Sequence, residues 1–128
     1  MFKPIKEKTL KEWAERKLGS SKCKRIIYVN RKRSNWLGEF IWETGTIKIN
    51  LHKVNSYHSL YRTVAHEWTH AQQYYREYKY WDSRKKYEDN PLEKEANFVE
   101  KNLHRTKFHI IKARKMAKKR FIKKIMGF

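Results

Sequence analysis

The sequence predicts a single α+β domain in which a small antiparallel sheet is flanked by helices. Three observations predict it: a helical stripe near the N-terminus, alternating apolar residues within 38–52, and three later segments with helical periodicity. The chain of 128 residues is 39% hydrophobic and 15% aromatic, which suits one modest core. We predict a globular domain over residues 1–105. Residues 106–128 then form a basic amphipathic helix that packs on this domain or extends it.

The first half of the chain predicts a helix, a short strand and a hairpin. Residues 4–18 carry a helical apolar stripe, and Gly19 is a natural stop. A short β-type run follows within residues 23–30. Alternating apolar side chains on both sides of Thr44-Gly45 then predict a hairpin over residues 38–52.

The second half predicts three helices. A long helix should begin near Tyr57, with Asn55 or Ser56 as its N-cap, and run to about residue 75. Asn90-Pro91 predicts the start of the next helix, because proline suits the first helical position. The tail from 108 to 128 has an apolar stripe near one face of a basic helix, formed by Ile110, Ala113, Ala117, Phe121 and Ile125.

Charge is concentrated at the C-terminal end. The formal net charge is +19, and residues 101–128 hold eleven lysines and arginines without any Asp or Glu. Such a distribution favours polyanionic partners, so nucleic acid or another polyanion is a candidate partner of the basic tail.

The apolar content and the cysteine count predict a cytoplasmic protein. Cys23 is the only cysteine, which excludes an intrachain disulfide and weakly suits a reducing compartment. The charged N-terminal segment lacks the apolar stretch of a secretory signal, and no apolar run is long enough for a transmembrane segment.

The segment "HEWTH" places His66 and His70 four residues apart, with Glu67 beside the first histidine. Residues four apart share one face of a helix, so both imidazoles can reach one Zn²⁺ ion. Glu67 lies one step round the helix, where it can act as general base on a metal-activated water. This is the HExxH arrangement of zinc metallopeptidases.

A catalytic zinc site of this type needs a third protein ligand. The metzincin pattern requires Gly and His where this chain has Gln73 and Arg76, so that class is excluded. The later helix offers glutamates instead, and a helical wheel places two of them about equally far from its apolar face. From the residues alone the choice stays open among these candidates: Glu93, Glu95 and Glu100.

With these motifs the chain resembles the gluzincin peptidases, and among them the single-domain minigluzincins. The resemblance covers roughly residues 26–103 and is carried by "GEFIWETGTIKINL", "HEWTH" and "NPLEKEAN". It implies a zincin-like fold in which Glu93 completes the metal site. It also implies that Asn97 supports a metal-binding histidine. The strand 46–51 would be the edge strand beside the cleft.

The resemblance implies a zinc metalloendopeptidase that hydrolyses an extended peptide or protein substrate. Gluzincins also often stabilise the oxyanion with a Tyr or His, and no motif selects among the candidates here: Tyr74, Tyr75, Tyr78, Tyr80 and His104. Two alternatives remain. One is a basic nucleic-acid-binding protein with a structural or inactive zinc site. SprT-like proteases also combine HExxH with DNA binding, but their third-ligand region usually differs, so the likeness to them is partial. The other is a latent peptidase blocked by its own C-terminal segment.

Overall fold

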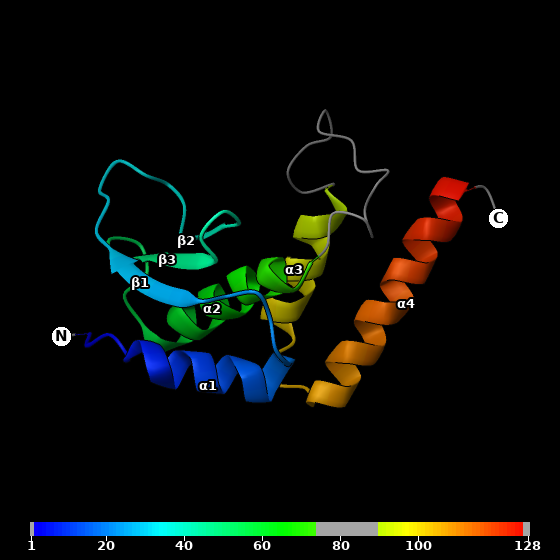
Figure 1. The fold of residues 1–128 in the computed structure, drawn as a ribbon, viewed down its shortest axis with the longest axis horizontal. Helices are drawn as coiled ribbons and strands as arrows, with labels where there is room; N and C mark the ends of the chain where they lie inside the picture. The colour runs from blue at the N-terminus through cyan, green and yellow to red at the C-terminus, as the bar shows by residue number, and fades with distance from the viewer. Residues whose placement is uncertain (1, 74–89, 127–128) are drawn as a thin grey trace.

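The computed structural model describes residues 2–73 and 90–126 of the chain, with side chains described as far as Arg120. Four helices and three strands are present in this part of the chain, which gives the α+β class that the sequence predicts. Figure 1 shows α2 near the sheet and α1, with α4 at the far end of the molecule. The elements are, in order, α1 (Glu7–Leu18), β1 (Arg25–Val29), β2 (Gly38–Ile41), β3 (Thr46–Asn50), α2 (Tyr57–Gln72), α3 (Pro91–Lys101) and α4 (Lys107–Met126).

The sheet is mixed rather than purely antiparallel, which corrects the sequence-based expectation. Strands β2 and β3 form the predicted antiparallel hairpin, and Gly45 makes its turn with a φ of 69°. Strand β1, however, pairs in parallel with β3, so the order across the sheet is β1-β3-β2. Strand β3 is therefore central, and the expectation of an edge strand over residues 46–51 is wrong. The edge strand of the hairpin is β2.

The hydrophobic core lies where α1, α2 and the sheet meet. Apolar residues recur along α1 at helical spacing and along β3 at every second position, so each element turns one face inward. Trp68 is the largest fully buried side chain of the described residues, and its indole Nε1 donates to the carbonyl of Gly19 at 2.8 Å. The main buried apolar residues are Leu10, Ala14, Leu18, Ile26, Ile47, Ile49, Val54, Leu60, Val64, Ala65, Trp68, Val99 and Ile110.

Helices α2 and α3 both begin at side-chain caps. The hydroxyl of Ser56 accepts from the amide of Ser59 at 3.2 Å, which selects Ser56 over Asn55 as the cap of α2. The side chain of Asn90 accepts from the amide of Leu92 at 2.9 Å, and Pro91 follows at the first helical position. The two helices pack against each other, which brings the start of α3 beside the C-terminal half of α2.

Helix α4 packs against α1 and α3. Ile110 is buried in the core and Ala113 is half-buried, whereas Ala117 of the predicted apolar stripe is exposed. The predicted stripe residues Phe121 and Ile125 lie beyond the described side chains. Of the helices within residues 2–73 and 90–126, none combines the length and apolar character needed to cross a bilayer.

Candidate metal centre

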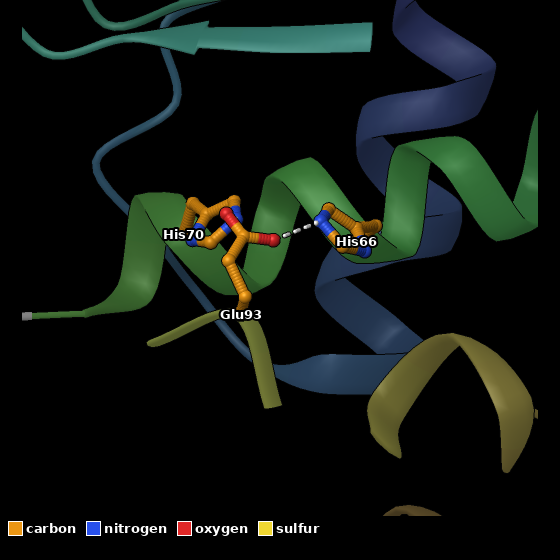
Figure 2. A group of neighbouring side chains, drawn as sticks. All are labelled: His66, His70 and Glu93. Atoms are coloured by element: carbon orange, nitrogen blue, oxygen red, sulfur yellow. Dashed lines mark hydrogen bonds and ion pairs between the residues drawn. The ribbon is translucent and has the colours of Figure 1, made fainter. Parts of the chain in front are cut away.

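Three potential metal ligands meet between α2 and α3. His66 and His70 lie one turn apart on α2, and Glu93 reaches toward both from the first turn of α3 (Figure 2). Oε2 of Glu93 is 3.0 Å from Nε2 of His66, and Oε1 is 2.9 Å from Nε2 of His70. One donor atom from each residue lies within 4.8 Å of the others. Ligand atoms of a tetrahedral zinc site lie roughly 3.4 Å apart, so the cluster is close to the required size.

The other nitrogen of His66 is held by a carboxylate. Its Nδ1 donates to Oε1 of Glu100 at 2.8 Å, because a carboxylate oxygen can only accept. The second oxygen of Glu100 is 3.3 Å from Nη2 of Arg62, which balances the charge of Glu100. With a metal ion bound, His66 would keep its proton on Nδ1 and would turn the lone pair on Nε2 toward the cluster.

His70 is held in the same tautomer by an amide. Its Nδ1 is 2.7 Å from Oε1 of Gln73. The Nε2 group of Gln73 donates to the carbonyl of Leu92 at 2.9 Å and to Oε1 of Glu95 at 2.8 Å, and both of these partners only accept. The orientation of the Gln73 amide is thereby fixed with its oxygen toward His70. Nε2 of His70 faces Glu93, and with a metal ion bound it would offer its lone pair to that ion.

The cluster requires a positive charge between these atoms. A nitrogen lone pair repels a carboxylate oxygen at about 3 Å unless a proton or a cation lies between them, and the cluster has two such contacts. Burial alone lowers the pKa of His66, but hydrogen bonds to Glu100 and Glu93 outweigh it and raise the pKa to about 10. The pKa of His70 is raised for the same reason, chiefly by Glu93 against the opposing effect of burial. The donor set of two imidazole nitrogens and one carboxylate fits Zn²⁺.

Glu67 lies beside the cluster without joining it. Its Oε2 is 4.0 Å from Nε2 of His66, and the residue is buried at 7% exposure. Burial raises the pKa of Glu67, and the nearby charges of His66 and His70 act in the opposite direction. A carboxylate whose pKa is raised from its ordinary value is better matched to proton transfer near neutral pH.

A cavity opens over the cluster along the edge strand β2. Trp36, Phe40 and Trp42 give it apolar walls, and Leu92 adds to them from α3. Glu67 and the three cluster residues also line this cavity. A second cavity continues past Gly38 toward Asn35 and Asn97 and shares Trp36 and Glu67 with the first. Together they form a groove that runs beside β2 and passes the cluster.

The structure separates the glutamates that sequence reasoning left open. Glu93 lies in the cluster, whereas Glu95 is buried on another side of α3 against Arg114 of α4, at 3.1 Å between Oε2 and Nε. Asn97, expected as the support of a histidine, lines the second cavity, and Glu100 occupies the position at Nδ1 of His66.

Sequence reasoning did not find the roles of Glu100 and Gln73. Glu93, Asn97 and Glu100 fall on one face of α3 at intervals of four and three residues. The sequence pattern alone therefore allows either Asn97 or Glu100 to be the hydrogen-bond partner of His66. In the sequence, Gln73 stands out only as a departure from the metzincin pattern. Of the candidates for the oxyanion role, His104 is exposed away from the cluster, and the others lie outside the described residues: Tyr74, Tyr75, Tyr78 and Tyr80.

Comparison with family models, with curated proteins and with solved structures returned no match to this chain. The geometry of the cluster, its groove and its hydrogen-bond partners therefore carries the functional argument.

Proposed function

We propose that the protein is a zinc-dependent endopeptidase of zincin-like fold, with His66, His70 and Glu93 as metal ligands. One observation carries the proposal. The Nε2 atoms of both histidines face one carboxylate, and both Nδ1 atoms donate to fixed acceptors, in the wall of an open groove. When bound there, zinc supplies Lewis acidity that lowers the pKa of a bound water and polarises a carbonyl group.

Glu67 is proposed as the general base and acid of the reaction. It is next to the ligand cluster and faces the same cavity, yet Glu93 takes the ligand position. Its carboxylate removes a proton from the attacking water and later delivers that proton to the leaving amine. Its burial keeps the pKa raised, so that the carboxyl group can exchange the proton in both directions.

The edge strand β2 is proposed to bind the substrate as an additional strand. Among the described residues β2 pairs only with β3, so its other edge has main-chain groups available for an extended peptide. Trp36, Phe40 and Trp42 stand beside this edge and favour a large apolar side chain near the scissile bond. The groove thus supports a peptide substrate with at least one bulky apolar residue.

Metal content and cleavage test the proposal together. Purified protein should contain about one zinc per chain, and Glu93→Ala should lose it while Glu39→Ala keeps it. A site of two histidines and one carboxylate also suits Fe(II), so the metal analysis must include iron. Protein that takes up zinc neither on purification nor on addition would refute the proposal.

The role of Glu67 needs its own variant. Glu67→Gln should bind zinc as the wild type does, while cleavage of an unstructured apolar peptide falls by about 10²–10⁴-fold. Glu39→Gln is the matched control, because Glu39 is an exposed carboxylate on the same groove and lies outside the cluster. Full activity in Glu67→Gln would remove Glu67 from the mechanism.

A second candidate function, nucleic-acid or other polyanion binding, is supported by the outer face of α4. Lys112, Lys115 and Lys119 are exposed and recur at intervals of three and four residues, so they form one stripe along the helix. This function predicts that the protein binds duplex DNA and that binding weakens steeply with added salt. Replacing all three lysines by glutamine should weaken DNA binding further. Polyanion binding is compatible with peptidase activity. Chelation of the metal distinguishes the two functions, because only the peptidase activity should be lost.

The arrangement of α4 bears on the alternative of a latent peptidase blocked by the C-terminal segment. Within the described residues, neither cavity of the groove is lined by a residue of α4. The helix instead contacts α1 and the opposite side of α3. This geometry favours an open groove over a groove covered by the tail.

A further inference from the structure

The basic helix α4 is joined to the metal centre by a chain of buried polar side chains. We propose that Arg114 is a positioning residue of this centre: through Glu95 and Gln73 it fixes the ring orientation and the tautomer of His70. The inference rests on the metal site proposed above. It gives the C-terminal helix a part in metal binding, in addition to any partner of its exposed lysines.

The first link is a buried ion pair between α4 and α3. Nε of Arg114 donates to Oε2 of Glu95 at 3.1 Å, and the two side chains are only 11% and 5% exposed. Nη1 of the same guanidinium donates to Oε1 of Gln72 at 2.7 Å. Lys118 adds a second positive charge 3.9 Å from Oε2 of Glu95. These positive charges compensate the carboxylate of Glu95 in its buried site.

The second link runs from Glu95 to Gln73. The other oxygen of the carboxylate, Oε1, accepts from Nε2 of Gln73 at 2.8 Å. Gln73 is 2% exposed, so its amide cannot turn to water for a replacement partner. An ionised Glu95 accepts through both oxygens, which satisfies Arg114 and Gln73 at the same time.

The third link ends at His70. Because its NH₂ group faces Glu95, the amide of Gln73 must present its oxygen to Nδ1 of His70, at 2.7 Å. That contact places the proton on Nδ1 and the lone pair on Nε2, where metal binding needs it. If the amide turned over, its NH₂ group would face Nδ1 and would favour the tautomer that cannot bind metal through Nε2.

Glu95→Gln is the sharpest perturbation, because it changes one oxygen to nitrogen and preserves the shape of the side chain. A glutamine at this position has a single acceptor, so it cannot satisfy both Arg114 and Gln73. We expect zinc affinity, measured by competition with a chromophoric chelator, to fall roughly 10–100-fold. The loss of zinc affinity in Arg114→Ala should lie within the same range, and Arg114→Lys should recover part of that affinity.

Arg120→Ala is the matched control, since Arg120 is an exposed arginine on the same helix. It should bind zinc as tightly as the wild type. Circular dichroism and thermal unfolding of the zinc-loaded full chain establish that each variant folds. If Arg114→Ala does not fold, Glu95→Gln decides the question.

A proton signal distinguishes positioning from general loosening of the fold. In the zinc-loaded wild type, the Nδ1 proton of His70 should exchange slowly with water, because Gln73 accepts it. In Glu95→Gln it should exchange faster, while the Nδ1 proton of His66, bound to Glu100, stays unchanged as an internal reference.

Wild-type zinc affinity in Glu95→Gln and Arg114→Ala, with an unchanged His70 proton, would overturn the inference and leave the metal site intact. An equal loss of zinc affinity in Arg120→Ala would also overturn the inference. A wild type that takes up no zinc would refute the proposed function itself, which is a different result.

Discussion

Gly38 allows strand β2 to lie directly against the helix that carries His66 and His70, the proposed metal ligands, and Gly38→Ala tests this contact. A Cβ atom at this position would lie 2.7 Å from Cγ2 of Thr63 and 3.2 Å from Cγ of Glu67. It would also lie 3.2 Å from the carbonyl oxygen of Lys48. Gly38 is not among the glycines with positive φ, so the backbone accepts alanine and the cost is purely steric.

The expected magnitude follows from these distances. Thr63 is 5% exposed and Glu67 is 7% exposed, so neither side chain can move into solvent without disturbing the packing of α2. Overpacking of this kind costs about 1–3 kcal/mol of the free energy of unfolding. Because one of the displaced atoms belongs to Glu67, kcat of the proposed peptidase should fall as well.

Thr63→Ser provides the matched compensation, because it removes the Cγ2 atom and keeps the hydroxyl group. The single variant should cost little, and the double variant should recover about 1 kcal/mol of the loss in Gly38→Ala, a coupling typical of residues in contact. Urea unfolding of the zinc-loaded full chain measures all four corners of the cycle, with an unchanged m-value as the check on two-state behaviour. The reasoning fails if Gly38→Ala is as stable as the wild type, or if the two substitutions are simply additive.

Three further predictions concern individual side chains. Glu100→Ala should weaken zinc affinity about 10–100-fold, whereas Asn97→Ala should change it little, as chelator competition would measure; the reverse order would contradict the role of Glu100. The pKa of His66, raised to about 10, means that the folded metal-free protein keeps a proton that the unfolded chain releases near pH 6.5. This stabilisation is complete below pH 6.5 and is lost as the pH rises toward 10, and zinc must displace the proton. Zinc should therefore raise Tm more at about pH 8.5 than at about pH 6.5, and a smaller rise at the higher pH would contradict the assignment. Burial raises the pKa of Cys23 to about 11, so iodoacetamide should alkylate this thiol in the folded protein much more slowly than in urea, as mass spectrometry would detect.

The sequence predicted those features that depend on neighbouring residues. The hairpin, the start of α2 near Tyr57 and the Asn90-Pro91 entrance of α3 follow from turn, cap and proline chemistry, and the structure has all three. The pair His66 and His70 also follows from local spacing, because the helix alone brings them to one face.

Features that depend on distant residues could not be predicted. The parallel pairing of β1 with β3 is set by long-range contacts, and nothing local distinguishes it from an antiparallel addition. Glu93 and Glu95 have similar positions relative to the apolar face of α3. What distinguishes them is Arg114, which lies on another helix and provides Glu95 with a buried partner.

The short length of β2 limits what the groove can hold. The strand has four residues, and along an edge only alternate residues point their main-chain groups outward. An added peptide would therefore be held by few main-chain hydrogen bonds over a short span. Under the proposed function, affinity then comes mainly from one or two side chains in the apolar wall. The substrate must also reach the groove as locally unfolded chain. Cleavage of a folded protein would follow the rate or extent of its own local unfolding, and stable domains would survive beside cleaved linkers.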